Sequence, residues 1–492
     1  MGYFKIIIKT SAADPLGTKE STIRMSRPKK VIIGIIIGTA MLVVGLAVLL
    51  PVLINSDTIN AKIIAAASQS IDGQVDFERI QLALLPRPHA IIFQGRMAVR
   101  DSVQGKWVEM SVFPRLSALL LARIEVADLK LKQPDFELRL PASSRNKSEK
   151  HNSFQGSEDL RQQIKEGLGA LVAVVKDVEV TIDDGHLSML AKDKAPLEWQ
   201  DITARLEVTE KRVAVDLTCS FSFIQKIVWN GELDLATLDL DGKVFLQGLE
   251  THPLMAYWRP DFDLKINGGR VDLTLQFQSQ GWSNWQGDFE SRTSMLKVQN
   301  DTRQTEIGPA FLNGRFNFSS SQMTLQIDRL DLDNPQLSLA GKLLVDSSET
   351  AGVHLKATGQ DINANAVRAT ALSLGGHISD VREVFDIVKG GQVPAITVEV
   401  QGKDWADLSN FERWRIDGEM TDGAIFIPTV NLDLTNVVGH AIIENGILTA
   451  ENTRANYIKT QGRKGSLKIG LVGDVKPFYL DIDLNADLTE LP

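Results

Sequence analysis

The seven histidines are the first residues to test for chemistry, because an imidazole can serve as a metal ligand or as a general base. They are dispersed along the chain, and neither an HExxH motif nor an i,i+4 histidine pair that could hold zinc occurs. The histidines are His89, His151, His186, His252, His354, His377 and His440. This spacing gives no reason to expect a metal centre.

Glycine pairs and acidic runs give no catalytic pattern either. The pairs at 268–269, 375–376 and 390–391 lack the GxGxxG or GxxxxGK[ST] context of a nucleotide site, and no GxSxG nucleophile elbow occurs. The acidic run at 328–333 lacks the glycine and terminal glutamate of a calcium loop. We therefore expect a protein that is not an enzyme and that uses no cofactor.

Composition excludes further classes of protein. The chain has 492 residues, a formal net charge of −9 and a single cysteine, Cys219. One cysteine excludes an intramolecular disulfide and a cysteine-based zinc cluster. The acidic balance, with no basic stretch beyond residue 55, argues against nucleic acid as a partner. Cys219 is in phase with the apolar side of its strand, so we expect it to be a small buried hydrophobe.

An uncharged segment of 24 residues, Val31 to Ile54, predicts a transmembrane helix. Its apolar run exceeds the roughly 7–15 residues of a signal-peptide core, and no small-x-small cleavage site follows it, which favours a retained anchor. Seven Lys and Arg against two acidic residues precede the segment, and no positive excess follows it. The positive-inside rule places residues 1–30 in the cytoplasm and the chain after about residue 55 on the other side.

Beyond the anchor the hydrophobic pattern changes from helical to alternating. Residues 57–69 predict a short helix, and from residue 74 apolar and polar residues alternate as in half-buried strands. The alternation is interrupted by a helical insert at 117–122, a polar linker at 142–157, and amphipathic helices at 158–176 and 379–389, the last ending at Gly390-Gly391.

The alternating runs supply the candidate lining residues of a lipid groove, because their apolar members share one face of each strand while the other face is polar. They are Val213, Val215, Leu217, Phe221, Val271, Leu273, Leu275, Phe277, Met323, Leu325, Ile327, Val353, Leu355, Ile396, Val398, Val400, Phe478, Leu480 and Ile482. Between Ile327 and Leu330 the apolar phase slips by one residue, which predicts a β-bulge.

The order of elements predicts a mainly β protein with mostly antiparallel strands, since no strand–helix–strand alternation is present. Roughly 25 strands in single file would extend on the order of 120 Å. Their apolar faces could pack against each other in a closed core, or a long curved sheet with few helices could leave an open apolar trough. An open trough needs an apolar occupant, and a lipid acyl chain fits that need.

Two regions resemble the AsmA-like family of bacterial envelope proteins. One is 31–141, with the anchor, a short helix, LLPRPHAIIFQGRMAVRD and SALLLARIEVADLKLKQPDFELRL; the other is about 377–492, with ISDVREVFDIVKGGQV and PFYLDIDLNADLTELP. The resemblance covers about half of the chain. It implies an inner-membrane-anchored periplasmic protein with a β-taco or repeating-groove fold. It also implies a part in phospholipid transport to the outer membrane, with no catalytic residues.

Pattern and resemblance together predict six segments. They are a basic tail (1–30), the anchor (31–54), an N-terminal β module (55–141), a polar linker (142–157), a helix with a β-rich groove region (158–376) and a C-terminal β module (377–492). Because the chain stops at Pro492 just after a strand, we expect the C-terminal module to be truncated.

Three functions remain open at this stage. The first is a lipid-binding or lipid-transfer protein whose partners are phospholipids, the inner membrane and outer-membrane or periplasmic assembly proteins. The second is a structural adaptor in outer-membrane protein assembly that carries no lipid. The third and weakest is an enzyme acting on envelope glycans or lipids, which a clustered acidic pair in a cleft would support.

Overall fold

A computed structural model describes a large part of the chain: residues 64, 73–85, 87–99, 103–119, 125–139, 177–191, 194–258, 265–300, 303–346, 352–376, 379–471 and 477–486. The predicted anchor from Val31 to Ile54 lies outside these residues, as do the polar linker at 142–157 and the helix at 158–176. Of the predicted helix at 57–69, only residue 64 is described. Within the described part, no helix is long and apolar enough to cross a bilayer.

Strands dominate the described residues, as the alternation predicts, and 23 of them form one sheet. They are β1 (Gln74–Asp76), β2 (Arg79–Ala83), β3 (His89–Val99), β4 (Val103–Pro114), β5 (Val126–Lys132), β6 (Asp135–Arg139), β7 (Val178–Leu190), β8 (Leu197–Val208), β9 (Arg212–Phe221), β10 (Ile224–Asp234), β11 (Leu240–Glu250), β13 (Arg270–Gln280), β14 (Asn284–Thr293), β17 (Ala310–Phe318), β18 (Gln322–Asp333), β19 (Gln336–Asp346), β20 (Gly352–Asn363), β21 (Val388–Gly402), β22 (Trp414–Ile427), β23 (Leu432–Glu444), β24 (Ile447–Tyr457), β25 (Thr460–Gly470) and β26 (Phe478–Asn485). A second, three-stranded sheet consists of β12 (Lys265–Gly268), β15 (Leu296–Asn300) and β16 (Arg303–Ile307).

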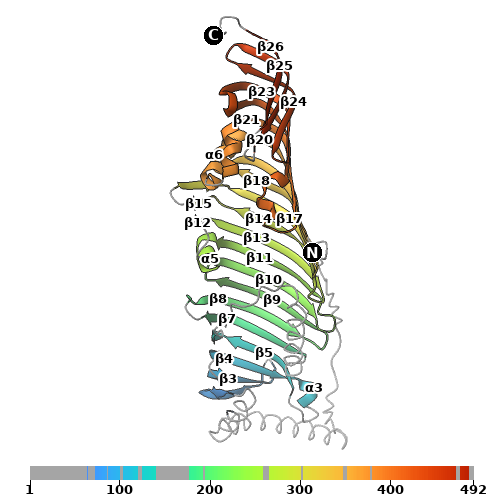
Figure 1. Ribbon diagram of the computed structural model, residues 1–492. Helices are drawn as coiled ribbons and strands as arrows, with labels where there is room; N and C mark the ends of the chain where they lie inside the picture. The colour runs from blue at the N-terminus through green and yellow to red at the C-terminus, as the bar shows by residue number, and fades with distance from the viewer. Residues whose placement is uncertain are drawn as a thin grey trace, which may run out of the picture.

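The large sheet is a single file of strands in which neighbours along the chain are neighbours in space (Figure 1). β1 and β2 lie end to end against β3, and β5 and β6 lie end to end between β4 and β7, so the 23 strands make 21 rungs. Every pairing among the described strands is antiparallel except those of β5 and β6 with β7. At ~4.8 Å per rung the sheet extends roughly 100 Å, somewhat less than the sequence-based expectation.

Strand register shows that the apolar residues stay on one side of this sheet. Direct cross-strand partners lie on the same face. Leu325 of β18 faces Phe316 of β17 and Leu343 of β19, and Leu343 in turn faces Leu355 of β20. Followed from strand to strand, this face connects β1 to β26, and its members are almost all aliphatic, aromatic or glycine. We call it the apolar face, and the opposite side the polar face.

Bulges keep the apolar residues in phase and bend the strands. The bulge predicted between Ile327 and Leu330 is confirmed by a register shift in the β18–β19 pairing. Many other strands carry a mid-strand residue with positive φ, a backbone conformation that Asp and Asn tolerate better than most residues. These include Asp184, Asp201, Asp361, Asp422, Asn436 and Asn452. Because a bulge increases local twist and bending, the row of bulges curves the sheet.

The helices between residues 251 and 387 and the small sheet lie along one long edge of the large sheet (Figure 1). α5 (Thr251–Trp258) packs against β12, which continues through β15 to β16, and α6 (Ala364–Gly375) packs against β16 and against α7 (Ser379–Ile387). The hydroxyls of Thr305 on β16 and Ser373 on α6 share a hydrogen bond. We call this series, from α5 to α7, the edge row.

The helices agree only partly with the sequence-based expectations. α3 (Leu116–Leu119) matches the start of the predicted insert, whereas α5 and α6 were not predicted. α7 ends at Ile387, and Gly390 and Gly391 belong to β21 instead of stopping a helix. Gly391 has φ +127°, and a Cβ there would lie 2.8 Å from the Cα of Gly423, so it permits a close approach of two strands. The described residues also include three short 3-10 turns, η1 (Asp407–Ser409), η2 (Phe411–Arg413) and η3 (Pro428–Val430).

Candidate functional site: the apolar face

Register places all nineteen predicted lining residues on the apolar face. On β9 the series from Val213 to Phe221 lies in phase with Leu246 and Leu273 of the neighbouring strands. On β26, Phe478 and Leu480 face Ile469 and Leu467 of β25 and so lie on the same side of the sheet. The sequence pattern thus identified one continuous surface, although its occupant does not follow from register.

Exposure shows how far this surface is covered. Four of the nineteen residues are buried, Val213, Phe277, Val353 and Val400, and the other fifteen are half-buried. On β17, β18 and β19 every large apolar side chain of this face is half-buried. In the part of the chain that the structure describes, these three strands make their substantial contacts only with neighbouring strands of the sheet. The apolar side chains of these three rungs therefore stay partly accessible to solvent, whereas four of the nineteen predicted residues are buried.

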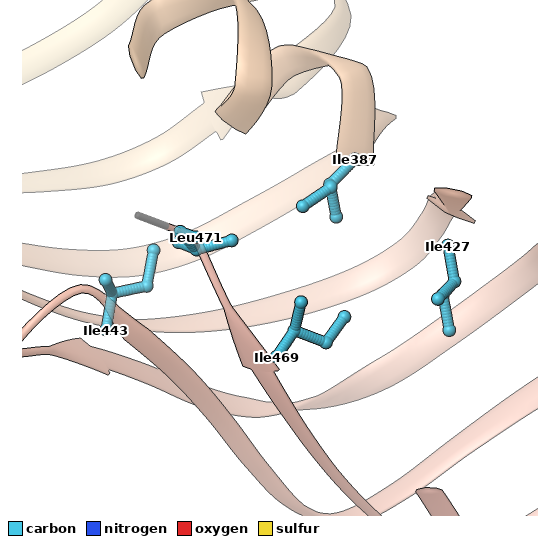
Figure 2. Packing of buried hydrophobic residues seen from close by; sticks show 5 residues of the cluster. All are labelled: Ile387, Ile427, Ile443, Ile469 and Leu471. Atoms are coloured by element: carbon cyan, nitrogen blue, oxygen red, sulfur yellow. The ribbon is translucent and has the colours of Figure 1, made fainter. Parts of the chain in front are cut away.

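At the C-terminal end the same face is filled. Ile387, Ile427, Ile443, Ile469 and Leu471 are buried together in one cluster (Figure 2), with partly buried side chains from β21 to β26 packed around them. On a flat strand β23, Leu432, the partner of Ile427, would lie roughly 35 Å from Ile443. Strands β22 and β23 must therefore curl over the apolar face to bring both ends of the rung into one core.

Aromatic rings lie over glycines along the apolar face. A Cβ placed on Gly105 would lie 2.4 Å from the ring of Phe136, and one placed on Gly242 would lie 2.8 Å from the ring of Phe277. The same arrangement joins Gly95 to Trp107, Gly287 to Phe316 and Gly314 to Phe289. Because these glycines have no side chain, each ring can lie flat against the backbone of the sheet. The apolar face therefore protrudes less at these positions.

An apolar hollow of about 270 Å³ opens on this face between β4 and β8. Its apolar lining includes Val103, Phe136, Ile182, Leu187 and Ile202, which share the apolar face by register. Three larger hollows, about 620, 400 and 300 Å³, are lined mostly by polar and charged side chains from β10 to β18. The hollow between β4 and β8 therefore has the chemical character of the apolar face, whereas the other three do not.

Three tryptophans bring unpartnered hydrogen-bond donors to the apolar face. The indole Nε1 atoms of Trp107, Trp199 and Trp229 are buried and have no acceptor within the described structure. Trp199 faces Leu187 and Phe221 across the strands, and its ring centroid lies 4.8 Å from that of Phe221. A buried donor left without a partner costs about 1–3 kcal/mol, so three in one surface need a physical reason. The alternation pattern could not reveal them, because it records polarity and not hydrogen-bond partners.

Cys219 is buried in the apolar face with 3% of its surface exposed, as expected. Burial raises the pKa of its thiol to about 11, so the thiol is protonated and unreactive at neutral pH. This environment is suited to packing and not to nucleophilic catalysis.

On the polar face, three histidines lie beside carboxylates that also form an ion pair with a Lys or Arg side chain. His186 lies 2.9 Å from Asp135, His354 lies 2.7 Å from Glu399, and His440 lies 2.6 Å from a carboxylate of β22. Burial works to raise the pKa of Asp135, but hydrogen bonds from His186 and Lys106 outweigh it and lower that pKa below its ordinary value. Within the described ranges, no three His, Cys, Asp or Glu side chains lie close enough to hold a metal ion.

Comparison with known proteins adds no relative to this description. No protein-family model matches the chain, and no curated protein matches it either.

Proposed function

We propose that the protein binds lipid acyl chains along its apolar face and supports phospholipid transport between the inner membrane and the outer membrane. The observation that carries this proposal is the continuous apolar face across β17, β18 and β19, whose large side chains are only half-buried. Exposed apolar surface of this extent is unfavourable in water unless an apolar partner covers it. The predicted anchor at 31–54 and the resemblance to the AsmA-like family support a periplasmic location next to the inner membrane.

The energetics of acyl transfer fit such a surface. Each CH₂ group removed from water contributes about 0.8 kcal/mol, so a 16-carbon chain is disfavoured in water by on the order of 12 kcal/mol. Half-buried aliphatic side chains on every second position supply apolar contact for the chain while the head group stays hydrated. The glycine-backed rings of Phe136 and Phe277 leave room above the sheet. Passive sliding along this surface needs no nucleotide site.

Charges on the apolar face test the proposal. Leu273→Asp with Leu325→Asp should abolish lipid binding, because two carboxylates on the path must be desolvated by the acyl chain. The matched control is Gln276→Asp with Gln326→Asp, on the same strands but on the polar face, where Lys243 and Lys342 lie opposite. We expect the control to retain lipid and the first variant to lose it, with equal circular dichroism spectra.

The measurement is phospholipid recovered with the purified full chain and identified by mass spectrometry. Lipid present in the wild type and the control but absent from the apolar-face variant supports the proposal. Consistent absence of lipid from the wild type overturns it and favours the alternative, a structural adaptor in outer-membrane protein assembly. Equal lipid in all three proteins also overturns it, because binding would then not involve the apolar face.

A further inference from the structure

Large apolar side chains that are exposed to solvent gather near the two ends of the sheet. In the described part of the chain, four of them belong to the first rungs, six belong to the region after β20, and none lies between β5 and β20. Leu85, in the first group, is 85% exposed, and Leu84 and Leu116 are 43% and 50% exposed. These three leucines project beyond the sheet, so the apolar face does not account for them.

The three leucines share one corner of the large sheet. Leu84 and Leu85 directly follow β2, which pairs with the start of β3. Leu116 opens α3 just after β4, and the end of β4 pairs with the same part of β3. Both chain reversals therefore lie at one long edge, next to the first rung (Figure 1). We call Leu84, Leu85 and Leu116 the leucine corner.

Polar and aromatic contacts attach the segment after Leu85 to the sheet. The guanidinium of Arg87 lies 2.6 Å from the carboxylate of Asp128 and 5.1 Å from the ring centroid of Phe113. The Nδ1 atom of His89 donates to the backbone oxygen of Arg87 at 2.7 Å, and the His89 ring stacks on Phe113. The neighbours of Leu85 are thus held against the sheet while the leucine itself projects into solvent.

α3 is attached in a similar way. The backbone amide of Arg115 donates to the backbone oxygen of Glu125 at 2.7 Å, and its guanidinium donates to the backbone oxygen of Asp177 at 2.9 Å. Ala118 is 5% exposed, so α3 buries one side and leaves Leu116 on the other. A pair of well-attached segments that both present leucine to solvent calls for an apolar partner outside the sheet.

Charge and position indicate which partner this is. Residues 73–132, which form β1 to β5, contain nine Lys and Arg against six Asp and Glu, whereas the whole chain has a net charge of −9. Apolar tips within a positive region fit the surface of an anionic bilayer. β1 begins twenty residues after the predicted anchor ends at Ile54, and twenty residues extend at most about 70 Å. The first rungs therefore lie within reach of the membrane.

The geometry points to a second membrane contact: we infer that the leucine corner inserts into the head-group region of an anionic phospholipid bilayer. The leucines enter the ends of the acyl chains, and the basic residues of the first rungs lie near the phosphates. This inference rests on the inner-membrane location in the proposed function and adds a contact separate from the anchor. It holds the first rung, where the apolar face begins, at the bilayer surface.

The test measures the depth of Leu85 with a fluorophore. Cys219 is the single cysteine, so Leu85→Cys in a Cys219→Ser background carries one nitrobenzoxadiazole label. The full chain is placed in vesicles of phosphatidylethanolamine and phosphatidylglycerol that contain lipid with a nitroxide near the head group or deep in the acyl chain. We expect about twofold quenching by the shallow nitroxide and less by the deep one, because such contacts lie roughly 5–10 Å into the boundary.

The matched control for exposure is Ile458→Cys in the same background. Ile458 is 70% exposed and also lies on a turn, but it belongs to the opposite end of the sheet (Figure 1). We expect its label to keep its emission with either nitroxide lipid.

A second measurement places the label at Leu116→Cys and changes the other two leucines. Leu84→Glu with Leu85→Glu should abolish the quenching at Leu116→Cys, because two carboxylates oppose entry into an anionic bilayer. The matched control is Gln74→Glu with Gln81→Glu, which adds the same charge at exposed sites of the first rung and should leave the quenching unchanged. All replaced side chains are exposed, so we expect equal circular dichroism spectra.

Four results would overturn the inference. Emission that neither nitroxide lipid quenches at Leu85→Cys contradicts it, while lipid recovered with the purified chain still supports the proposed function. Equal quenching at Leu85→Cys and Ile458→Cys shows that the contact is not specific to the leucine corner. A blue-shifted emission without quenching places the corner against protein, such as a second copy of the chain. If the full chain does not float with the vesicles, the membrane location fails and the inference fails with it.

Discussion

The rungs β17–β19 and the rungs β21–β25 present the same apolar face but bury it differently. In the first region the large apolar side chains are half-buried, and in the second Ile427 and Ile469 are 0% and 4% exposed. Both regions have the same alternating sequence pattern. Alternation alone therefore determines which side of the sheet is apolar, and it does not determine whether that side is open or closed.

Bulge density accounts for the difference. The pairings β17–β18 and β18–β19 show one register shift each and the flanking pairings β14–β17 and β19–β20 show none, whereas each pairing from β21–β22 to β24–β25 shows at least two. Each bulge adds twist and bend, so the C-terminal strands curl over their own apolar face while the central strands stay more regular. α7 and η2 add Ile387 and Phe411 to the closed core.

The largest expected difference between the two regions is in the stability lost when a large apolar side chain is replaced by alanine. Ile469→Ala in the closed core should lower the free energy of local unfolding by about 3 kcal/mol, because the lost contacts leave a cavity. Ile327→Ala on the half-buried face should cost about 1 kcal/mol, since solvent already reaches that site. A sheet of stacked rungs can unfold in parts, so hydrogen exchange of the β25 and β18 amides is the appropriate measurement. Equal losses would contradict the distinction between a closed and an open region.

Thiol reactivity gives the next largest contrast. Burial raises the pKa of Cys219 to about 11 from an ordinary 9.0, so at pH 8 its thiolate fraction falls roughly 100-fold. Alkylation of Cys219 should be slower by that factor than alkylation of Leu325→Cys in a Cys219→Ser background, and its rate should rise with pH up to about 11. The time course of maleimide labelling by mass spectrometry measures both rates. Similar rates would show that the central face is as closed as the surroundings of Cys219.

The same raised pKa has a consequence for stability. The protonated thiol is favoured in the folded chain, so its contribution is complete below the unfolded pKa near 9 and is lost as the pH rises through the folded value of about 11. The free energy of unfolding should therefore fall less steeply between pH 8 and pH 11 in Cys219→Ser than in the wild type. Urea unfolding of both proteins across this pH range measures the difference.

Much of this fold was predictable from the sequence because a β-strand has a side-chain period of two. The alternation from Val271 to Phe277 and the phase slip after Ile327 both follow from that period, and the register agrees with both. α6 was missed although Asn363 caps it by accepting from the Ala366 amide at 3.1 Å, because a single asparagine after a strand is a weak signal.

The candidate site was less predictable than the fold. The lining residues follow from alternation, but the free donor of Trp199 does not, because its state depends on which groups lie around the indole in space. The closed core at Ile427 also depends on bulges. Asp422 and Asn436 mark two of these within otherwise regular strands, and such mid-strand Asp and Asn residues are the signal that could have predicted them.

Adding a methyl group at a closely packed glycine should give a smaller difference in stability between the C-terminal rungs and the rungs before them. Gly423→Ala would place a Cβ 2.4 Å from the sulfur of Met420 and 3.0 Å from the Cβ of Val437, within closely packed strands. We expect a loss of about 2 kcal/mol there. Gly242→Ala meets only the ring of Phe277, at 2.8 Å, and that ring can lift away from the sheet, so a loss of about 1 kcal/mol is expected.

The measurement for both glycine variants is the urea dependence of hydrogen exchange in β22 and β11. If the apolar face binds lipid as proposed, Gly242→Ala should also reduce the amount of bound lipid, because the displaced ring of Phe277 would occupy part of that surface. A larger loss at Gly242 than at Gly423 would mean that the central rings are held from above by a layer, contrary to an open face.

The smallest expected effect lies in the first rungs, where β6 pairs with β7 in parallel and no hairpin joins them. Asp135 of β6 binds His186 of β7 at 2.9 Å and Lys106 of β4 at 2.9 Å, which links three rungs across the polar face. Asp135→Asn should lower the free energy of unfolding by about 0.5 kcal/mol at pH 7, since these side chains are more than one-third exposed and solvent screens the ion pairs.

The effect of Asp135 should depend on pH. Because the hydrogen-bonded carboxylate has a lowered pKa, its contribution to stability is present above the ordinary value of 3.8 and is lost as the pH falls through the folded value. Hydrogen exchange of the β6 and β7 amides in wild type and variant should therefore differ at pH 7 and converge towards pH 3; a difference that persists at pH 3 would assign the effect to packing of the side chain and not to its charge.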